Sequence, residues 1–294
     1  MTVVQRCHEL TLADEIRCTL RDSPDLQLFG LIDGTVTNSA LDPFFQLAPE
    51  AEYDPLFLDT EYAACLPYSP YLIHLDAAAA DFLQQYGHWC DSGVIWMLST
   101  GNLSRQAGFW RSLIQVMTPD NKVALLRFWS APILAGLLEH SSDGERATLL
   151  ASCRTLYTPD TDRHWRRWQG PDTATDTKAQ PTPWWQLQHH HLQGFAAGFE
   201  RLLVDEIEDQ LWRTEPEAIA TVYPPLLPDL IRDGNGIART LGLQSDAALL
   251  WFARCRLRLG LDFWRHPALT DLWHPLTPTE QAFVQWADKA LSHA

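Results

Sequence analysis

The fold is decided by the stretch FWRSLIQVMTPDNKVALLRFWSAPILAGLL, Phe109 to Leu138, in which two strands and the turn between them can be read. Leu113–Met117 and Val123–Trp129 are rich in aliphatic, β-branched and aromatic residues, the types that strands favour. Between them lies TPDNK, 118–122, where proline presets φ for a turn and Asp or Asn can adopt the left-handed conformation. The stretch therefore predicts a β-hairpin.

A helix is predicted to follow the hairpin directly. Ser130 can cap its first turn, and Pro132 falls in that turn, where proline is common. Apolar residues then recur at the spacing of one helix face, at Ile133, Leu134, Leu137 and Leu138. The order strand, turn, strand, helix follows from these residues alone.

Strands and helices alternate through the rest of the N-terminal half. Short apolar runs bounded by turn residues predict strands, and a capping Asp or a turn before a periodic run predicts a helix start. We therefore expect a mixed sheet with helices packed against it. The predicted strands are Leu26–Ile32, Pro55–Leu58, Tyr71–Leu75 and Val94–Leu98, and the predicted helices begin at Asp76 and near Asn102.

The C-terminal half is predicted to be helical throughout. Apolar residues recur every three or four positions from Leu192 to Leu211, which predicts a long amphipathic helix. Ser245 can cap another helix that Gly260 ends, and Thr277-Pro278-Thr279-Glu280 is a capping box.

The two halves are separated by residues 170–183, GPDTATDTKAQPTP, which are polar, contain proline and show no apolar periodicity. Such a composition is typical of a linker. We expect an α+β protein with an N-terminal mixed α/β lobe at 1–169, a linker at 170–183 and an all-α C-terminal lobe at 184–294.

The composition argues against nucleic acid and membranes as partners. The chain has 22 Lys and Arg against 37 Asp and Glu, a net charge of −15, which repels phosphate backbones and anionic lipid. No stretch approaches the ~20 apolar residues of a membrane span, and the N-terminus lacks the pattern of a signal peptide, so we expect a cytoplasmic protein. Six cysteines without a C-x-x-C pair predict neither a disulfide framework nor a zinc site.

No catalytic constellation can be assembled from the sequence. Leu31-Ile32-Asp33-Gly34-Thr35 partly resembles the D-x-D-G-T signature of haloacid-dehalogenase-type phosphatases, but Leu31 stands where the nucleophilic aspartate would be. His189-His190-His191 are consecutive, so on a helix they point ~100° apart and cannot converge on one ion. We expect no enzyme activity, no metal and no cofactor.

Tryptophan is enriched instead, with thirteen residues, several of them beside arginine. Tryptophan and arginine dominate the hot spots of protein–protein interfaces, although for any single one of these residues packing in or along a core is the favoured role. As a group they favour a binding protein over an enzyme. The residues predicted to bind a partner are Trp110, Arg111, Arg127, Trp129, Trp184, Trp185, Phe263 and Trp264.

An ordered set of short motifs resembles a known family, the effector chaperones (adaptors) of bacterial type VI secretion. The resemblance runs from about Leu26 to Pro267, with one departure: Ser130-Ala131-Pro132 replaces the Asp-Pro-Arg that usually continues the Arg-Phe-aromatic segment. The matching motifs are Leu31–Gly34, Pro55–Phe57, Ser69–Leu75, Phe109–Val116 and Leu126–Trp129 in the first half, and Leu241–Ser245, Gly260–Phe263 and His266-Pro267 in the second.

This resemblance implies a non-catalytic cytosolic protein that binds the N-terminal region of a toxic effector and helps to load it onto a VgrG-type spike. The two-lobed pattern suggests that an apolar effector segment docks in a groove between the lobes. Two alternatives remain open: a phosphatase-like hydrolase built around Asp33, and a structural subunit of the secretion apparatus itself.

Overall fold

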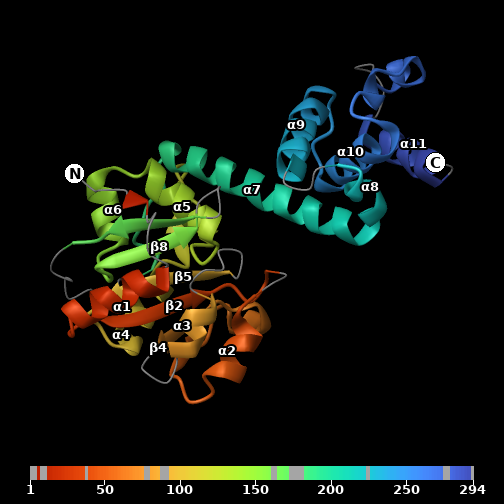
Figure 1. Cartoon of the computed structure of the whole chain (residues 1–294). Coiled ribbons are helices and arrows are strands. Elements are labelled where there is room, and N and C mark those ends of the chain that lie inside the picture. The colour runs from red at the N-terminus through yellow and green to blue at the C-terminus, as the bar shows by residue number, and fades with distance from the viewer. Residues whose placement is uncertain are drawn as a thin grey trace. The chain divides into compact units, whose positions relative to one another are not determined.

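The computed structural model describes residues 5–6, 12–36, 39–75, 80–86, 93–159, 164–171, 182–222, 226–273 and 279–292. The chain forms two compact units, Met1–Gly198 and Phe199–Ala294 (Figure 1). Described strands all lie in the first unit, whereas every described element of the second is helical. The predicted α+β class, an α/β lobe followed by a helical lobe, is confirmed.

The first unit is built on a seven-stranded sheet in the order β1-β9-β8-β5-β2-β4-β3. Every described pair of strands in it is antiparallel, so the prediction of a mixed sheet is wrong. The central strands β2 and β5 are buried on both faces, which explains why their sequences are unbroken apolar runs. The strands are β1 (Gln5–Arg6), β2 (Gln27–Ile32), β3 (Tyr53–Pro55), β4 (Tyr71–Leu75), β5 (Val94–Ser99), β8 (Thr155–Pro159) and β9 (Trp165–Gln169).

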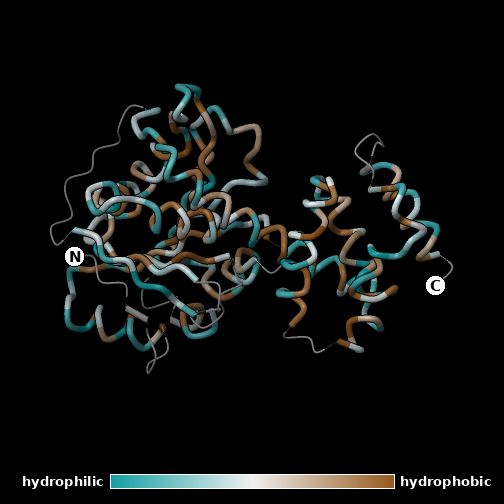
Figure 2. Tube along the Cα trace, turned by 90° about the horizontal axis from the view of Figure 1, so that it is seen from above, coloured by the Kyte–Doolittle hydropathy of each residue, from teal (hydrophilic) through white to brown (hydrophobic). Residues whose placement is uncertain are grey.

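Helices cover both faces of this sheet. The core on one face unites α1, α2 and α3 with alternate strand residues such as Ile32, Ile73 and Trp96. In Figure 2 the hydrophobic colouring follows the central strands between these layers. Helices α4 and α5 contact strands of the same sheet. The helices are α1 (Leu12–Asp22), α2 (Leu41–Leu47), α3 (Ala80–Tyr86), α4 (Leu103–Ser112), α5 (Ala131–His140) and α6 (Asp143–Leu149).

The predicted hairpin forms, with shorter strands than expected. It consists of β6 (Gln115–Met117) and β7 (Val123–Leu125), paired antiparallel. Its turn uses the predicted chemistry: Asn121 has φ 59°, and the Thr118 N–H donates to the Lys122 carbonyl at 2.8 Å. The second strand ends at Leu125 because the following Phe128 and Trp129 turn into the core.

Two predicted helix starts are confirmed in this unit. Helix α5 begins after Ser130 with Pro132 in its first turn, although the Ser130 side chain forms no capping hydrogen bond. Helix α4 begins after Asn102, whose side chain accepts a hydrogen bond from the Arg105 N–H at 3.0 Å. Residues 76–79 lie outside the described residues, so the cap expected at Asp76 stays a prediction.

The strand predicted at Pro55–Leu58 is wrong beyond its first residue. Strand β3 ends at Pro55, and a turn follows in which the Leu58 N–H donates to the Pro55 carbonyl at 3.0 Å. Leu56 and Phe57 are buried by this turn. Four apolar residues look alike in a strand and in a buried turn, and here tertiary packing selected the turn.

The second unit packs its helices around a separate core that includes Phe252, Phe263 and Phe283. The long predicted helix is confirmed as α7 (His189–Thr214), which begins in the first unit and ends in the second. Helix α10 begins as predicted after Ser245, whose side chain accepts a hydrogen bond from the Ala248 N–H at 3.3 Å. The helices of this unit beyond α7 are α8 (Pro216–Ala220), α9 (Leu227–Thr240), α10 (Asp246–Leu259) and α11 (Thr279–Ser292).

Two further predictions in this unit concern the helix end at Gly260 and the capping box at Thr277-Pro278-Thr279-Glu280. Gly260 ends α10 with φ 103°, as predicted. Thr277 and Pro278 lie outside the described residues, and the Glu280 carboxylate accepts hydrogen bonds from the Gln244 and Ser245 N–H groups before α10. Glu280 therefore stabilises the start of another helix.

Most of the expected linker, residues 172–181, lies outside the described residues, so its boundaries stay a prediction. The segment that follows belongs to the first unit. The Met117 N–H donates to the Trp185 carbonyl at 2.9 Å, and the Leu187 N–H donates to the Met117 carbonyl at 2.8 Å. This segment therefore runs parallel to β6.

Candidate functional site

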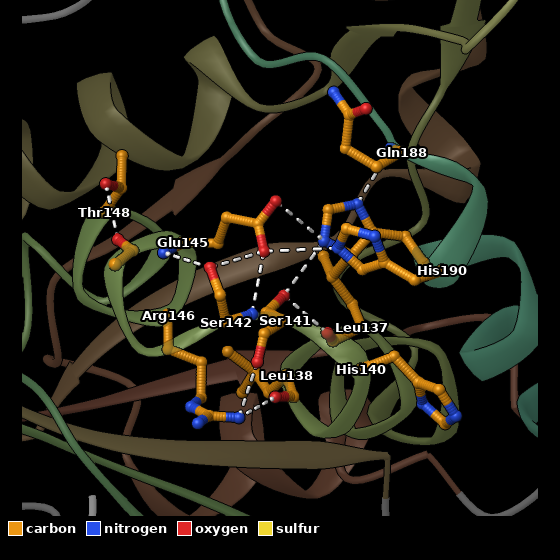
Figure 3. A network of polar contacts seen from close by, with 12 residues as sticks. Leu137, Leu138, His140, Ser141, Ser142, Glu145, Arg146, Thr148, Gln188 and His190 are labelled. Atoms are coloured by element: carbon orange, nitrogen blue, oxygen red, sulfur yellow. Dashed lines mark hydrogen bonds and ion pairs between the residues drawn. The ribbon is translucent and has the colours of Figure 1, made fainter. Parts of the chain in front are cut away.

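Three ionisable side chains meet where the N-termini of α6 and α7 come together. Glu145 lies in the first turn of α6 and His190 in the first turn of α7 (Figure 3). His191 follows His190 in the same turn. One ligand atom from each lies within 4.8 Å of the others. The expectation that consecutive histidines cannot converge is therefore wrong for His190 and His191. Glu145 could not be found at helical spacing from them in the sequence, because it comes from a different helix.

Glu145 is held by a capping box with Ser142. The Ser142 N–H and Oγ–H both donate to Glu145 Oε2 at 2.7 Å, and Ser142 Oγ accepts from the Glu145 N–H at 3.3 Å. Burial alone would raise the pKa of Glu145, but these hydrogen bonds and one from His190 outweigh it and lower the pKa to about 2. The Ser-x-x-Glu spacing is a sequence signal that could have located this box.

His191 is a fixed hydrogen-bond donor. Its side chain is 0% exposed, and its Nδ1 accepts a hydrogen bond from the Gln188 N–H at 3.0 Å. The proton of the neutral ring is therefore on Nε2, which faces Ser141 Oγ at 3.3 Å and Glu145 Oε1 at 3.6 Å. Burial lowers the pKa of His191, and the charge of His190 lowers it further, which favours the neutral ring.

This tautomer decides what the cluster can do chemically. A metal would need the lone pair of His191 Nε2, and ligating histidines donate through their other nitrogen, whereas His191 Nδ1 accepts. A catalytic triad needs the serine and the carboxylate on opposite ring nitrogens, but both face Nε2 here, and Ser141 Oγ donates to the Leu137 carbonyl at 2.7 Å. The geometry fits a structural link between α6 and α7.

Asp33 occupies a turn with its carboxylate fully engaged. Oδ1 accepts from the Thr35 N–H at 2.9 Å and from the Thr35 hydroxyl at 2.6 Å, and Oδ2 accepts from Arg127 at 3.3 Å. Leu31, at the position of the phosphatase nucleophile, is buried in β2. The arrangement favours the turn role of Asp33 over a catalytic one.

Two of the predicted partner-binding tryptophans lie in the core. Trp110 is 1% exposed and packs against Phe128, with the ring centroids 5.1 Å apart and the ring planes tilted by 31°. Trp129 is 3% exposed and meets Phe57 edge to face at 5.5 Å. Burial leaves these rings no surface for a partner, because α4 and the segment after the hairpin turn their aromatic sides inward.

The two predicted arginines hold loops of the first unit. Arg111 pairs with Asp54 and donates to the carbonyls of Pro55 and Leu56 at 3.2 and 3.3 Å. The side chain of Arg127 is 43% exposed, although it reaches Asp33. Arg127 thus keeps surface that a partner could contact.

The remaining predicted residues lie in different units. Trp184 and Trp185 meet at 5.8 Å in the first unit, where the half-buried Trp184 donates to Ser112 Oγ at 2.9 Å and Trp185 is buried. Phe263 is buried in the core of the second unit, next to the half-buried Trp264. The eight residues therefore do not all lie on one unit, and for those that keep exposed surface a role in partner binding stays a prediction.

Comparisons with known proteins give one match, to a family model. No curated protein and no solved structure matches the chain. A family model does match: residues 28–148, from β2 into α6, correspond to a domain of unknown function, DUF4123. No described helix is both long and apolar enough to cross a membrane.

Proposed function

We propose that the protein is an effector adaptor of a bacterial type VI secretion system. It binds the N-terminal region of a toxic effector, keeps the effector soluble and helps to load it onto a VgrG-type spike. The observation that carries this proposal is the DUF4123 match over residues 28–148, a region that contains all five N-terminal motifs resembling such adaptors.

The proposed role is non-catalytic and cytoplasmic. The geometry of the polar groups supports it, since Asp33 is engaged in a turn and the Nδ1 lone pair of His191 is used by a backbone N–H. The departure from the family pattern also bears on partner choice. Ser130 and Ala131 are buried at the start of α5, so this position offers a partner no charged groups. Partner contacts then fall on other surfaces.

Affinity purification tests the proposal. The tagged full chain is purified gently from its own cells, and retained proteins are identified by mass spectrometry, with the same tag on an unrelated protein as control. We expect a single large toxin, with or without a spike protein. Recovery of the chain alone contradicts the proposal, and recovery of many sheath or spike copies favours the structural-subunit alternative.

The hydrolase alternative has its own test. The purified chain is assayed with a generic phosphate ester and divalent metal, beside the Asp33→Asn variant. We expect no turnover by either protein. Turnover that disappears in the variant would contradict the non-catalytic role.

A further inference from the structure

Charge is distributed unevenly along the first unit. Between Arg21 and Arg105 the chain contains no lysine or arginine, whereas Asp and Glu recur throughout. Two arginines from later in the chain reach back to this region, where Arg111 pairs with Asp54 and Arg127 with Asp33. Other carboxylates of the region stay exposed, including those around α2 and β3.

An aromatic surface lies in this region, where α2 meets strands β3 and β4 at one edge of the sheet. Its rings pack on one another: Phe45 lies 5.1 Å from Tyr53 and 5.9 Å from Tyr71, and Tyr53 lies 6.1 Å from Tyr71. Phe45 is 37% exposed and Tyr53 47%. We call Phe45, Tyr53 and the half-buried Tyr71 the aromatic edge; aromatic rings that cluster at a surface are typical of interaction sites.

Carboxylates surround the aromatic edge. Asp42 lies three positions before Phe45 on α2 and hence on the same side of the helix. Glu50 follows α2, and Glu52 directly precedes Tyr53; all three acids are exposed. Within the described part of the chain, Asp42 and Glu50 form no ion pair, and Glu52 reaches only His74, at 3.6 Å.

A shallow open depression adjoins Tyr53. Its volume is about 570 Å³, and it lies between the start of β3 and the start of α4. It can receive a side chain of a bound segment beside the aromatic edge. The residues that line it are Ala51, Glu52, Tyr53, Asn102, Leu103 and Ser104.

We infer that the aromatic edge binds a segment of a partner protein in which Lys or Arg alternates with apolar side chains. The rings offer apolar area and π faces that attract a guanidinium or ammonium group, and the surrounding carboxylates complement its charge. Acidic segments and nucleic acids are repelled by the same carboxylates. This inference rests on the proposed function, because it takes the partner to be a protein effector. It adds the chemistry of the effector segment that binds.

Peptide binding to the full-length chain tests this surface. The probe is a fluorescent peptide that alternates leucine and arginine, compared with one that alternates leucine and glutamate and one that alternates serine and arginine. We expect the leucine–arginine peptide to bind best, with an affinity that falls as salt screens the charges.

Charge-reversal variants locate the site. The double variant Asp42→Lys, Glu50→Lys changes exposed carboxylates without ion pairs, so it should fold normally, and it should weaken binding of the leucine–arginine peptide about tenfold. The matched control is the double variant Glu217→Lys, Asp288→Lys, which reverses two exposed carboxylates of the second unit and should leave affinity unchanged. Tyr53→Ser should weaken binding of the leucine–arginine peptide more than binding of the serine–arginine peptide.

Equal affinity of the double variant Asp42→Lys, Glu50→Lys and the wild type overturns the inference, as does equal binding of the leucine–glutamate peptide. An equal loss in the double variant Glu217→Lys, Asp288→Lys also overturns it, because attraction would then depend on net charge alone. If a toxin that the wild type retains also stays bound to the double variant Asp42→Lys, Glu50→Lys, the inference about the aromatic edge is wrong and the adaptor role stands. If no toxin is retained but the peptides discriminate as expected, the adaptor role fails and the surface stands.

Discussion

At the scale of single residues, one histidine shows how the backbone can decide side-chain chemistry. The Gln188 N–H donates to His191 Nδ1, so this ring acts at the start of α7 as Glu145 acts at the start of α6. The ring then donates from Nε2 toward Ser141 and Glu145. A histidine that serves as both acceptor and donor must stay neutral.

Replacing His191 with glutamine tests this assignment. Glutamine can accept from Gln188 and donate toward Glu145, but it does not titrate. In the wild type the folded pKa lies below the ordinary 6.5, so the unfolded chain binds more protons below that pH and stability falls as the pH drops. We expect His191→Gln to flatten the loss of unfolding free energy between neutral and mildly acidic pH. Parallel pH profiles of the unfolding free energy for the two proteins would contradict the assignment of His191 as a neutral ring.

Glu145→Gln acts in a lower pH range. The pKa of Glu145 is lowered from 4.5 to about 2, so the stability that its charged form contributes is present above pH 4.5 and is lost as the pH falls toward 2. At neutral pH we expect the variant to be less stable by about 1 kcal/mol, because a neutral amide accepts the Ser142 hydrogen bonds more weakly than a carboxylate and no longer favours the helix N-terminus. Denaturant unfolding at several pH values measures this, and an unchanged wild-type slope below pH 4.5 in the variant would contradict the assignment.

At the scale of elements, the contact between α5 and α7 depends on glycine. A Cβ on Gly136 would lie 2.3 Å from the Gly194 carbonyl oxygen, and one on Gly194 would lie 2.1 Å from the Gly136 oxygen. A Cβ on Gly198 would come within 2.8 Å of the Pro132 oxygen. These obstacles are backbone atoms, so the helices would have to move apart to accept a side chain.

Gly194→Ala should therefore destabilise the first unit. Overpacking costs about 1–3 kcal/mol, which exceeds the ~1 kcal/mol that alanine gains over glycine within a helix. Gly144→Ala in α6 is the matched control, because a Cβ there meets nothing within 4 Å and should not destabilise. Denaturant unfolding compares the two variants, and equal stabilities would mean that the α5–α7 contact adapts freely.

Elements with local signals could be predicted from the sequence, and those that depend on distant partners could not. The hairpin and the start of α4 follow from turn and capping residues within a few positions, and the start of α5 follows from the proline in its first turn. Strand β9 escaped prediction because its sequence, WRRWQ, is rich in charge. Its Arg166 pairs with Glu139 and its Arg167 with Glu15, both distant in sequence.

The candidate site shows the same division. Trp110 and Trp129 are of a residue type that is common at interfaces, and only the fold shows that they lie in the core. Glu145 reaches His190 across 45 positions, a distance at which no spacing rule applies. The aromatic edge likewise combines Phe45 of α2 with Tyr53 and Tyr71 of two strands, so its surface exists only after folding.

At the scale of the whole molecule, the charge is concentrated where a partner is proposed to bind. The net charge of −15 includes a long N-terminal region without lysine or arginine, and residues 28–148 of the DUF4123 match cover most of it. A protein of this charge repels nucleic acid and attracts cationic segments. An adaptor for an effector with a basic, apolar N-terminal region fits this surface.

The most direct test of the adaptor role is secretion of the retained toxin from cells that lack this chain. The amounts of toxin in the soluble fraction and in the medium are measured beside a spike protein of the same apparatus, with the wild-type gene restored as control. We expect the toxin to lose solubility and to be secreted no longer, while the spike protein is still released. Normal secretion of the toxin, or loss of the spike protein as well, would contradict the adaptor role.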